Sequence, residues 1–246
     1  MRYFIDIAYK GTNFAGWQKQ QNAHTIQAEI EQKLSWYFKQ NIEIVGSGRT
    51  DAGVHAFQQI AHFDIEKQIS KDDFLYRLNK MLSESIAIKD MYEVKSNAHA
   101  RFDAVYRSYQ YHILTKKSPF IKNDALYYPY KIDIEKMQEA TKILLEHNDF
   151  QAFSKVHTEV NNFLCQIYKA EWEIQEDKII FHIAANRFLR GMVRAIVGTL
   201  LAIAKNKITI EEFRDIFDSK NRQNAGESID ADGLYLSEVL YDKEII

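Results

Sequence analysis

A glycine-rich stretch at residues 44–57, IVGSGRTDAGVHAF, holds residue types that could perform chemistry. Three of the chain's nine glycines fall within eight residues there: Gly46, Gly48 and Gly53. Arg49 and Asp51 lie between them, and an arginine at this spacing can keep a carboxylate ionised and oriented. A rigid loop that presents one carboxylate suits a nucleophile or a general base. The alternative is a long hairpin turn whose polar residues face solvent.

A second stretch, NRFLRGMVRAIVG at residues 186–198, combines arginines with apolar residues. If residues 187–205 form a helix, Arg187, Arg190 and Arg194 share one face of it. An arginine on a largely buried helix usually has an anionic partner. No carboxylate lies within four residues of Arg194, so its partner would come from elsewhere in the fold or from a ligand. A solvated stripe on an amphipathic helix is the alternative.

The third stretch is ARFDAVYRSYQYHI, residues 100–113. In a strand over residues 105–112, Arg107, Tyr109 and Tyr111 share one face. Aromatic and arginine side chains on an exposed sheet face can stack on bases and bind phosphates. The alternative is an ordinary strand, since tyrosine favours strands.

Composition limits the other classes of function. Hydrophobic residues make up 46% of the 246 residues, and the chain has no apolar run long enough to span a membrane. The single cysteine, Cys165, excludes an intramolecular disulfide and fits a cytoplasmic protein in which it is a core thiol. No histidine pair has metal-ligand spacing, and no nucleotide-binding P-loop occurs. The net charge of −2 argues against a general nucleic-acid coat protein, although residues 99–122 carry five basic residues and one acidic residue.

Hydrophobic periodicity predicts the elements that position these stretches. In the first half, we expect strands at 2–9, 42–45, 54–65 and 86–94, a helix capped by Thr25 and a helix opened by a capping box at Ser70–Asp73. In the second half, we expect strands at 105–115, 164–175, 178–185 and 234–241, and helices at 133–147, 187–205 and 210–217. Each half has the order βαββαβ, so the prediction is an α+β fold of two tandem ferredoxin-like halves. Residues 1–104 would carry the glycine-rich loop, and residues 105–246 the arginine helix.

The segment GRTDAGVHA, residues 48–56, is similar to the signature of the TruA family of tRNA pseudouridine synthases. Further segments resemble successive motifs of that family in the family's order, and the resemblance covers essentially the whole chain. These segments are YKGTNFAGWQKQ (9–20), HARFDAVYRSYQYHI (99–113), NDFQAFS (148–154), FLRGMVRAIVG (188–198) and GLYL (233–236).

The resemblance implies a role for individual residues. The family's catalytic aspartate falls on Asp51, with the arginine beside it at Arg49. The tyrosine that contacts the target base falls on Tyr109, the arginine that pairs with the catalytic carboxylate on Arg194, and the leucine of the base pocket on Leu234. The remaining tRNA contacts are expected from Arg107, Arg187 and Arg190.

The resemblance also implies the reaction and the partners. Family members isomerise uridine to pseudouridine in the anticodon stem-loop, at positions 38, 39 and 40 of tRNA. Their two halves form a shared antiparallel sheet flanked by helices. They act as homodimers with tRNA lying across both subunits, and they need neither a metal nor an organic cofactor. Which of these uridines this chain modifies does not follow from the sequence.

Two other functions compete with this interpretation. A non-catalytic RNA-binding protein would explain Tyr109, Tyr111 and the arginines. It would leave the Asp51 carboxylate without a role, close to phosphates that repel it. A ferredoxin-like acyl-phosphate hydrolase would need an anion-binding loop that leads into a helix, whereas this loop leads into a predicted strand.

Overall fold

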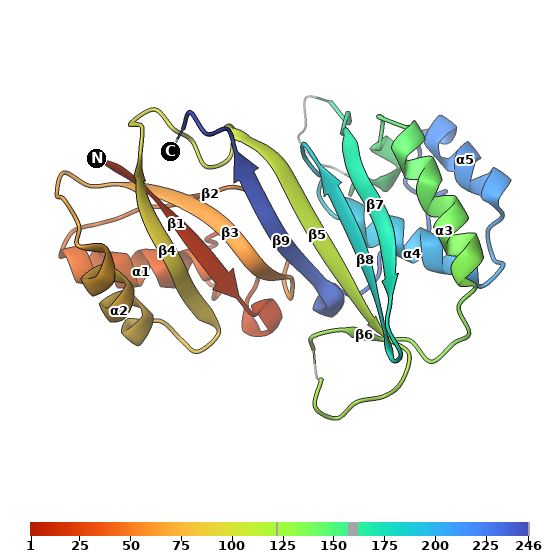
Figure 1. Ribbon diagram of the computed structural model, residues 1–246, viewed down its shortest axis with the longest axis horizontal. Coiled ribbons are helices and arrows are strands. Elements are labelled where there is room, and N and C mark those ends of the chain that lie inside the picture. The colour runs from red at the N-terminus through yellow and green to blue at the C-terminus, as the bar shows by residue number, and fades with distance from the viewer. Residues whose placement is uncertain (122, 157–161, 246) are drawn as a thin grey trace. The chain divides into compact units, whose positions relative to one another are not determined.

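The computed structural model describes residues 1–121, 123–156 and 162–245. The chain forms two compact units (Figure 1). The first comprises Met1–Tyr106 together with the C-terminal residues from Tyr235, and the second is Arg107–Leu234. Lys122 of the basic segment lies outside the described residues.

The first unit is a sheet covered by two helices on one face. Its elements are β1 (Arg2–Tyr9), α1 (Ile26–Phe38), β2 (Val45–Gly46), β3 (His55–Asp64), α2 (Lys71–Met81), β4 (Ile86–Val94) and the C-terminal strand β9 (Leu234–Tyr241). The strand order is β4-β1-β3-β9. Strand β2 also pairs with β3, where Val45 and Gly46 lie opposite His62 and Ala61. Pairs β1–β3 and β1–β4 are antiparallel, and β9 runs parallel to β3.

The apolar alternation of the strands fixes which face the helices cover. Tyr3 of β1 stacks on Phe63 of β3, and Phe63 stacks in turn on Phe74 of α2. Phe38 at the end of α1 contacts the same two phenylalanines. Both helices lie on one face of this sheet (Figure 1), and they bury their apolar stripes against the aromatic side chains of that face.

The second unit has the same general plan. Its elements are β5 (Ala104–Leu114), β6 (Leu126–Tyr127), α3 (Ile134–Ile143), β7 (Ile167–Ile174), β8 (Lys178–Ala185), α4 (Met192–Ala204) and α5 (Ile210–Ser219). The antiparallel order is β5-β8-β7, and β6 adds to β5 in parallel. Trp172 of β7 packs on Phe181 of β8 and donates its indole N–H to Thr141 of α3 at 2.8 Å, which ties the sheet to the helix layer.

The α+β class is confirmed, and each unit carries a largely antiparallel sheet. The predicted division into residues 1–104 and 105–246 differs from these two units at the C-terminus, where the residues from Tyr235 group with the first unit. There His55 and Ala56 of β3 pair with Tyr235 and Leu236, so these residues group with the first unit. None of the helices in the described ranges combines the length and hydropathy needed to cross a membrane.

One predicted cap forms and the other does not. The Thr25 hydroxyl accepts the N–H of Ala28 at the start of α1, as expected. The capping box at Ser70–Asp73 was a wrong prediction, because Ser70 makes no side-chain cap bond. A capping box needs a Glu or Gln at its third helical position, and the shorter Asp73 instead accepts hydrogen bonds from Tyr37 and Arg77.

The helix predicted over 187–205 begins at Met192. Gly191 takes a φ of 72° immediately before it, in the left-handed region that glycine tolerates. Arg187 and Arg190 therefore precede the helix, and the predicted arginine stripe on one helix face is wrong. Only Arg194 lies on α4.

Candidate active site

The start of the glycine-rich loop is hydrogen-bonded to strand β3. The backbone N–H of Ser47 donates to the Ile60 carbonyl at 2.7 Å, and its hydroxyl donates to Oε1 of Gln59 at 2.8 Å. The amide of Gln59 donates back to the Gly48 carbonyl at 2.8 Å. Gln59 is completely buried, so these bonds are shielded from water and fix the start of the loop.

Thr50, the neighbour of Asp51, is fixed on two sides. Its buried hydroxyl shares a hydrogen bond of 2.8 Å with the hydroxyl of Tyr9. Its carbonyl accepts the N–H of Trp17 at 3.1 Å. Gly16 makes this approach possible, because a Cβ there would lie 2.7 Å from the Thr50 carbonyl oxygen and the residue has a φ of 99°.

The chain turns sharply after Asp51. The Val54 N–H donates to the Asp51 carbonyl at 3.2 Å, and Gly53 supplies the positive φ, 82°, that the turn requires. Val54 is then clamped against Gly11, where any Cβ would lie 2.0 Å from the Val54 carbonyl oxygen. Asp51 itself is half-buried. The loop thus presents one carboxylate from a backbone that is anchored both before and after it.

The other two glycines of the loop have different roles. Gly46 lies against the indole of Trp17, and a Cβ there would come within 2.6 Å of the ring. Gly48 has no heavy atom within 4 Å of the position that a Cβ would occupy. The side chain of Arg49 is exposed and forms no ion pair with Asp51 in the described part of the chain. The close Arg49–Asp51 pairing suggested by their spacing is therefore wrong.

In the second unit, Arg194 is bound to the segment that follows α5. Its Nε donates to the Ile229 carbonyl at 2.6 Å, and the Ile229 N–H donates to the Arg194 carbonyl at 3.2 Å. Gly198, one turn further along α4, lets this segment approach, because a Cβ there would lie 1.9 Å from the Glu227 carbonyl oxygen. The half-buried guanidinium is thereby held in one orientation.

The tyrosines of β5 do not form one stacking surface. Tyr111 is completely buried and donates its hydroxyl to the Asp230 carbonyl at 2.8 Å. Burial raises the pKa of this hydroxyl. The predicted base-stacking role of Tyr111 is therefore wrong. Tyr109 is half-buried and meets Phe188 edge to face, with 5.0 Å between the ring centres.

Asn186 accepts hydrogen bonds from two of the arginines that were predicted to contact RNA. No sequence motif indicated this role. The Asn186 carbonyl accepts Nη1 of Arg107 at 2.9 Å, and its side-chain oxygen accepts the backbone N–H of Arg187 at 2.8 Å. The same oxygen accepts the Gln166 N–H at 2.9 Å, which fixes Asn186 to the start of β7. Arg190 is exposed, and its carbonyl accepts the Lys155 N–H.

Two other residues of the prediction are buried. Leu234 is 6% exposed and opens β9, directly after Gly233, which packs against the His112 carbonyl. Cys165 is also buried, and burial raises the pKa of its thiol to about 11, so it stays protonated and unreactive. Within the described ranges, no three His, Cys, Asp or Glu side chains are grouped as ligands for a metal ion.

Each unit therefore contributes different chemistry. The first presents the Asp51 carboxylate on an anchored loop. The second holds Arg194 on α4, Arg107 and Tyr109 in the first half of β5, and Arg187 just after β8. The pairing of Asp51 with Arg194 joins residues of both units and stays a prediction.

Comparison with known proteins identifies a single family. The family described as "tRNA pseudouridine synthase" matches residues 6–103 and 140–242. A "tRNA pseudouridine synthase A" from Parabacteroides distasonis is 47% identical over 247 residues, covering 99% of this chain and 97% of the relative. The protein of that name from Porphyromonas gingivalis is 44% identical over 248 residues, with 99% and 98% covered. The one from Bacillus pumilus is 37% identical over 246 residues, with 98% and 100% covered.

Proposed function

Since this chain belongs to the tRNA pseudouridine synthase family, we propose that it isomerises uridine to pseudouridine in tRNA, with Asp51 as the catalytic residue. The observation that carries this assignment is the anchoring of the loop on both sides of Asp51. Thr50 is held by Tyr9 and Trp17, and Val54 is clamped against Gly11. Such fixed geometry is what a carboxylate needs to act on a sugar or a base.

The reaction breaks the N1–C1′ bond of a uridine, turns the uracil, and joins C5 to C1′. The C5 proton is lost and N1 gains a proton, so no external reactant is consumed. The target uracil must first leave its stack, which costs roughly a few kcal/mol. This cost favours target uridines in loops and at helix ends. Stacking on Tyr109 would offset part of this cost, since base–aromatic stacking is worth ~1–3 kcal/mol.

The remaining residues would bind the substrate. Arg194 would pair with the Asp51 carboxylate and hold it ionised in a site emptied of water. Leu234 would line the base pocket, and Arg49 would stand beside the catalytic aspartate. Phosphate contacts would come from Arg107, Arg187 and Arg190. The bond from the Arg107 guanidinium to the Asn186 carbonyl supports this role for Arg107, because a fixed guanidinium loses less freedom on binding.

The assignment extends to the target and the assembly. We expect the modified uridines to lie in the anticodon stem-loop, at positions 38, 39 and 40, and the active form to be a cytoplasmic homodimer with tRNA across both subunits. Mapping of pseudouridine in tRNA incubated with the protein tests the positions directly. Pseudouridine confined to another arm of the tRNA would contradict the expected target.

The decisive variant is Asp51→Asn, which keeps the size of the side chain and removes its charge. We expect this variant to release no tritium from tRNA carrying tritium at C5 of its uridines, because the amide cannot act as nucleophile or base. Its affinity for tRNA should stay within about threefold of wild type, since the arginines are untouched. Filter binding and tritium release on the same preparations provide both numbers.

Two outcomes would overturn this assignment in different ways. Turnover by Asp51→Asn at the wild-type rate would remove Asp51 from the chemistry. Tight tRNA binding by wild-type protein without any tritium release would instead favour the non-catalytic RNA-binding function.

A further inference from the structure

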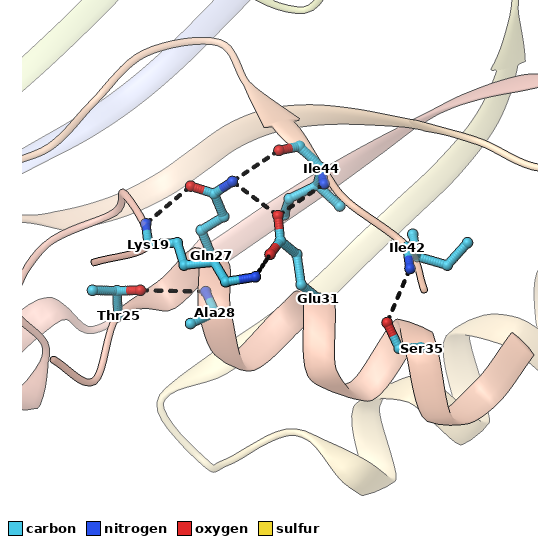
Figure 2. Close-up of polar contacts among 8 residues, drawn as sticks. All are labelled: Lys19, Thr25, Gln27, Ala28, Glu31, Ser35, Ile42 and Ile44. Atoms are coloured by element: carbon cyan, nitrogen blue, oxygen red, sulfur yellow. Dashed lines mark hydrogen bonds and ion pairs between the residues drawn. The ribbon is translucent and has the colours of Figure 1, made fainter. Parts of the chain in front are cut away.

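The segment that leads into the glycine-rich loop is bound to a helix and not to a strand. A strand was predicted at residues 42–45, but β2 contains only Val45 and Gly46. The N–H of Ile42 donates to the Ser35 hydroxyl of α1 at 3.0 Å, and the N–H of Ile44 donates to the Glu31 carboxylate of α1 at 3.1 Å (Figure 2). Side chains of α1 thus replace a neighbouring strand as the partners of this backbone.

Glu31 binds three groups: one on its own helix and one on each of two other segments. Its Oε1 accepts the Ile44 N–H and also Nε2 of Gln27 at 2.9 Å, and its Oε2 accepts Nζ of Lys19 at 2.9 Å (Figure 2). The carboxylate is buried, with 6% of its side chain exposed, whereas the lysine is 57% exposed. The hydrogen bond from Lys19 raises the pKa of that ammonium, which keeps it charged beside Glu31.

Gln27 completes the same connection one turn earlier on α1. Its Nε2 donates to the Ile44 carbonyl at 3.0 Å, and its Oε1 accepts the Lys19 N–H at 3.0 Å (Figure 2). Glu31 and Gln27 together therefore satisfy both backbone polar groups of Ile44 and hold the 17–19 segment beside them.

Both segments lead to the residues that precede Asp51 in the loop. From Ile44 the chain passes through β2 to Ser47, Gly48 and the loop. From Lys19 the connection runs back two residues to Trp17, whose N–H binds the Thr50 carbonyl and whose ring covers Gly46. Glu31 thus contacts both segments through its carboxylate, as Gln27 does through its side-chain amide.

We infer that Glu31, assisted by Gln27, is a positioning residue for the Asp51 loop: it acts on the reaction through backbone and does not contact the substrate. The expected effect of Glu31 on turnover rests on the proposed function, whereas its effect on the position of the loop does not. Removing the carboxylate leaves the buried Ile44 N–H without its acceptor, takes one of two acceptors from the half-buried Gln27 amide, and releases the segment that carries the loop. We expect a loop displacement of about 1 Å to lower turnover by up to about 10²-fold. The arginines proposed to bind tRNA would stay in place.

Glu29 offers a matched control on the same helix. It is buried to a similar degree, with 8% exposed against 4% for Glu31. Its carboxylate also accepts one backbone N–H, that of Ser83 at 2.8 Å, and one side chain, His24 at 2.9 Å. Glu29 thus anchors the turn before β4 and has no bond to the 42–46 segment.

The experiment compares Glu31→Ala, Glu29→Ala and Glu31→Gln well below their melting temperatures. Both alanine variants should lose a similar amount of thermal stability, on the order of 5 °C in Tm. Only Glu31→Ala should lower kcat for tRNA, by about tenfold or more, with KM within about threefold of wild type. Glu31→Gln should recover most of kcat, because its amide oxygen can still accept the Ile44 N–H.

Amide hydrogen exchange of the peptide over residues 42–54 gives a readout that does not depend on activity. It should quicken in Glu31→Ala and stay at the wild-type rate in Glu29→Ala. Equal exchange in the two alanine variants, or equal kcat losses, would overturn the positioning role. A wild-type protein that releases no tritium would refute the proposed function alone, since the exchange comparison would still decide the role of Glu31.

Discussion

At the residue scale, the backbone is fixed on both sides of Asp51. Thr50 is bound through its hydroxyl and its carbonyl, and Val54 is held by the turn and by Gly11. Arg49, which the spacing suggested as the partner of Asp51, points into solvent. The expected partner of the Asp51 carboxylate is therefore Arg194, whose guanidinium is itself oriented by the Ile229 carbonyl.

Replacement of Arg194 by lysine tests this expectation. Arg194→Lys keeps the positive charge but loses the planar fork, so one ammonium cannot bind the Ile229 carbonyl and also a carboxylate in the arginine geometry. We expect kcat to fall on the order of 10²-fold, measured as tritium release at saturating tRNA. The same change at Arg214, an exposed residue that pairs with Glu146, should leave kcat unaltered. Equal rates for the wild type and Arg194→Lys would reduce Arg194 to a support for the 226–230 segment.

At the scale of elements, glycines and helix starts decide what the loop and the arginines can do. Helix α4 begins only after Gly191, so Arg187 and Arg190 lie on the segment that connects β8 to α4. There the side chain of Asn186 binds the backbone N–H of Arg187. At α5, Thr209 and Glu212 form a complete capping box, which was not among the predicted caps. Ser70 lacks one because Asp73 is too short and already bonded. The side-chain length at the third helical position separates the two cases.

Two glycines of the same loop should respond differently to the same substitution. Gly46→Ala forces a methyl group into the Trp17 indole and should destabilise the protein by about 1–3 kcal/mol. Gly48→Ala places its methyl group in open space and should stay within about 0.5 kcal/mol of wild type. Urea unfolding of the two variants measures both values. A loss at Gly48 as large as that at Gly46 would show that the loop resists any side chain, and that contact with Trp17 is not the cause.

At the scale of the whole molecule, two units of similar plan contribute different chemistry. The first unit supplies the carboxylate loop, and the second supplies arginine and tyrosine side chains on β5 and α4. A single chain carries a net charge of only −2, so tRNA binding must depend on local basic surface rather than on overall attraction.

The assembly can be measured directly. We expect sedimentation equilibrium to give twice the mass of the chain at micromolar concentration, as a homodimer with tRNA across both subunits requires. A mass equal to one chain, together with full tritium release, would mean that one subunit suffices for the reaction.

The sequence by itself determined the order of elements and the place of Asp51. The strand at 2–9 and the Thr25-capped helix followed from periodicity and from a cap bond that spans three residues. The flanking glycines identified the loop. These features are local, so their physical cause lies within a few residues of where it acts.

Only the tertiary structure decided how these parts are held. It buried Tyr111 against Asp230, 119 residues away in the sequence, and so removed it from the expected stacking surface. A strand was predicted at 42–45, and the fold instead binds the backbone of residues 42 and 44 to Ser35, Glu31 and Gln27. A backbone N–H accepts any suitable oxygen that the fold brings within reach, and which oxygen arrives depends on contacts that no local pattern contains.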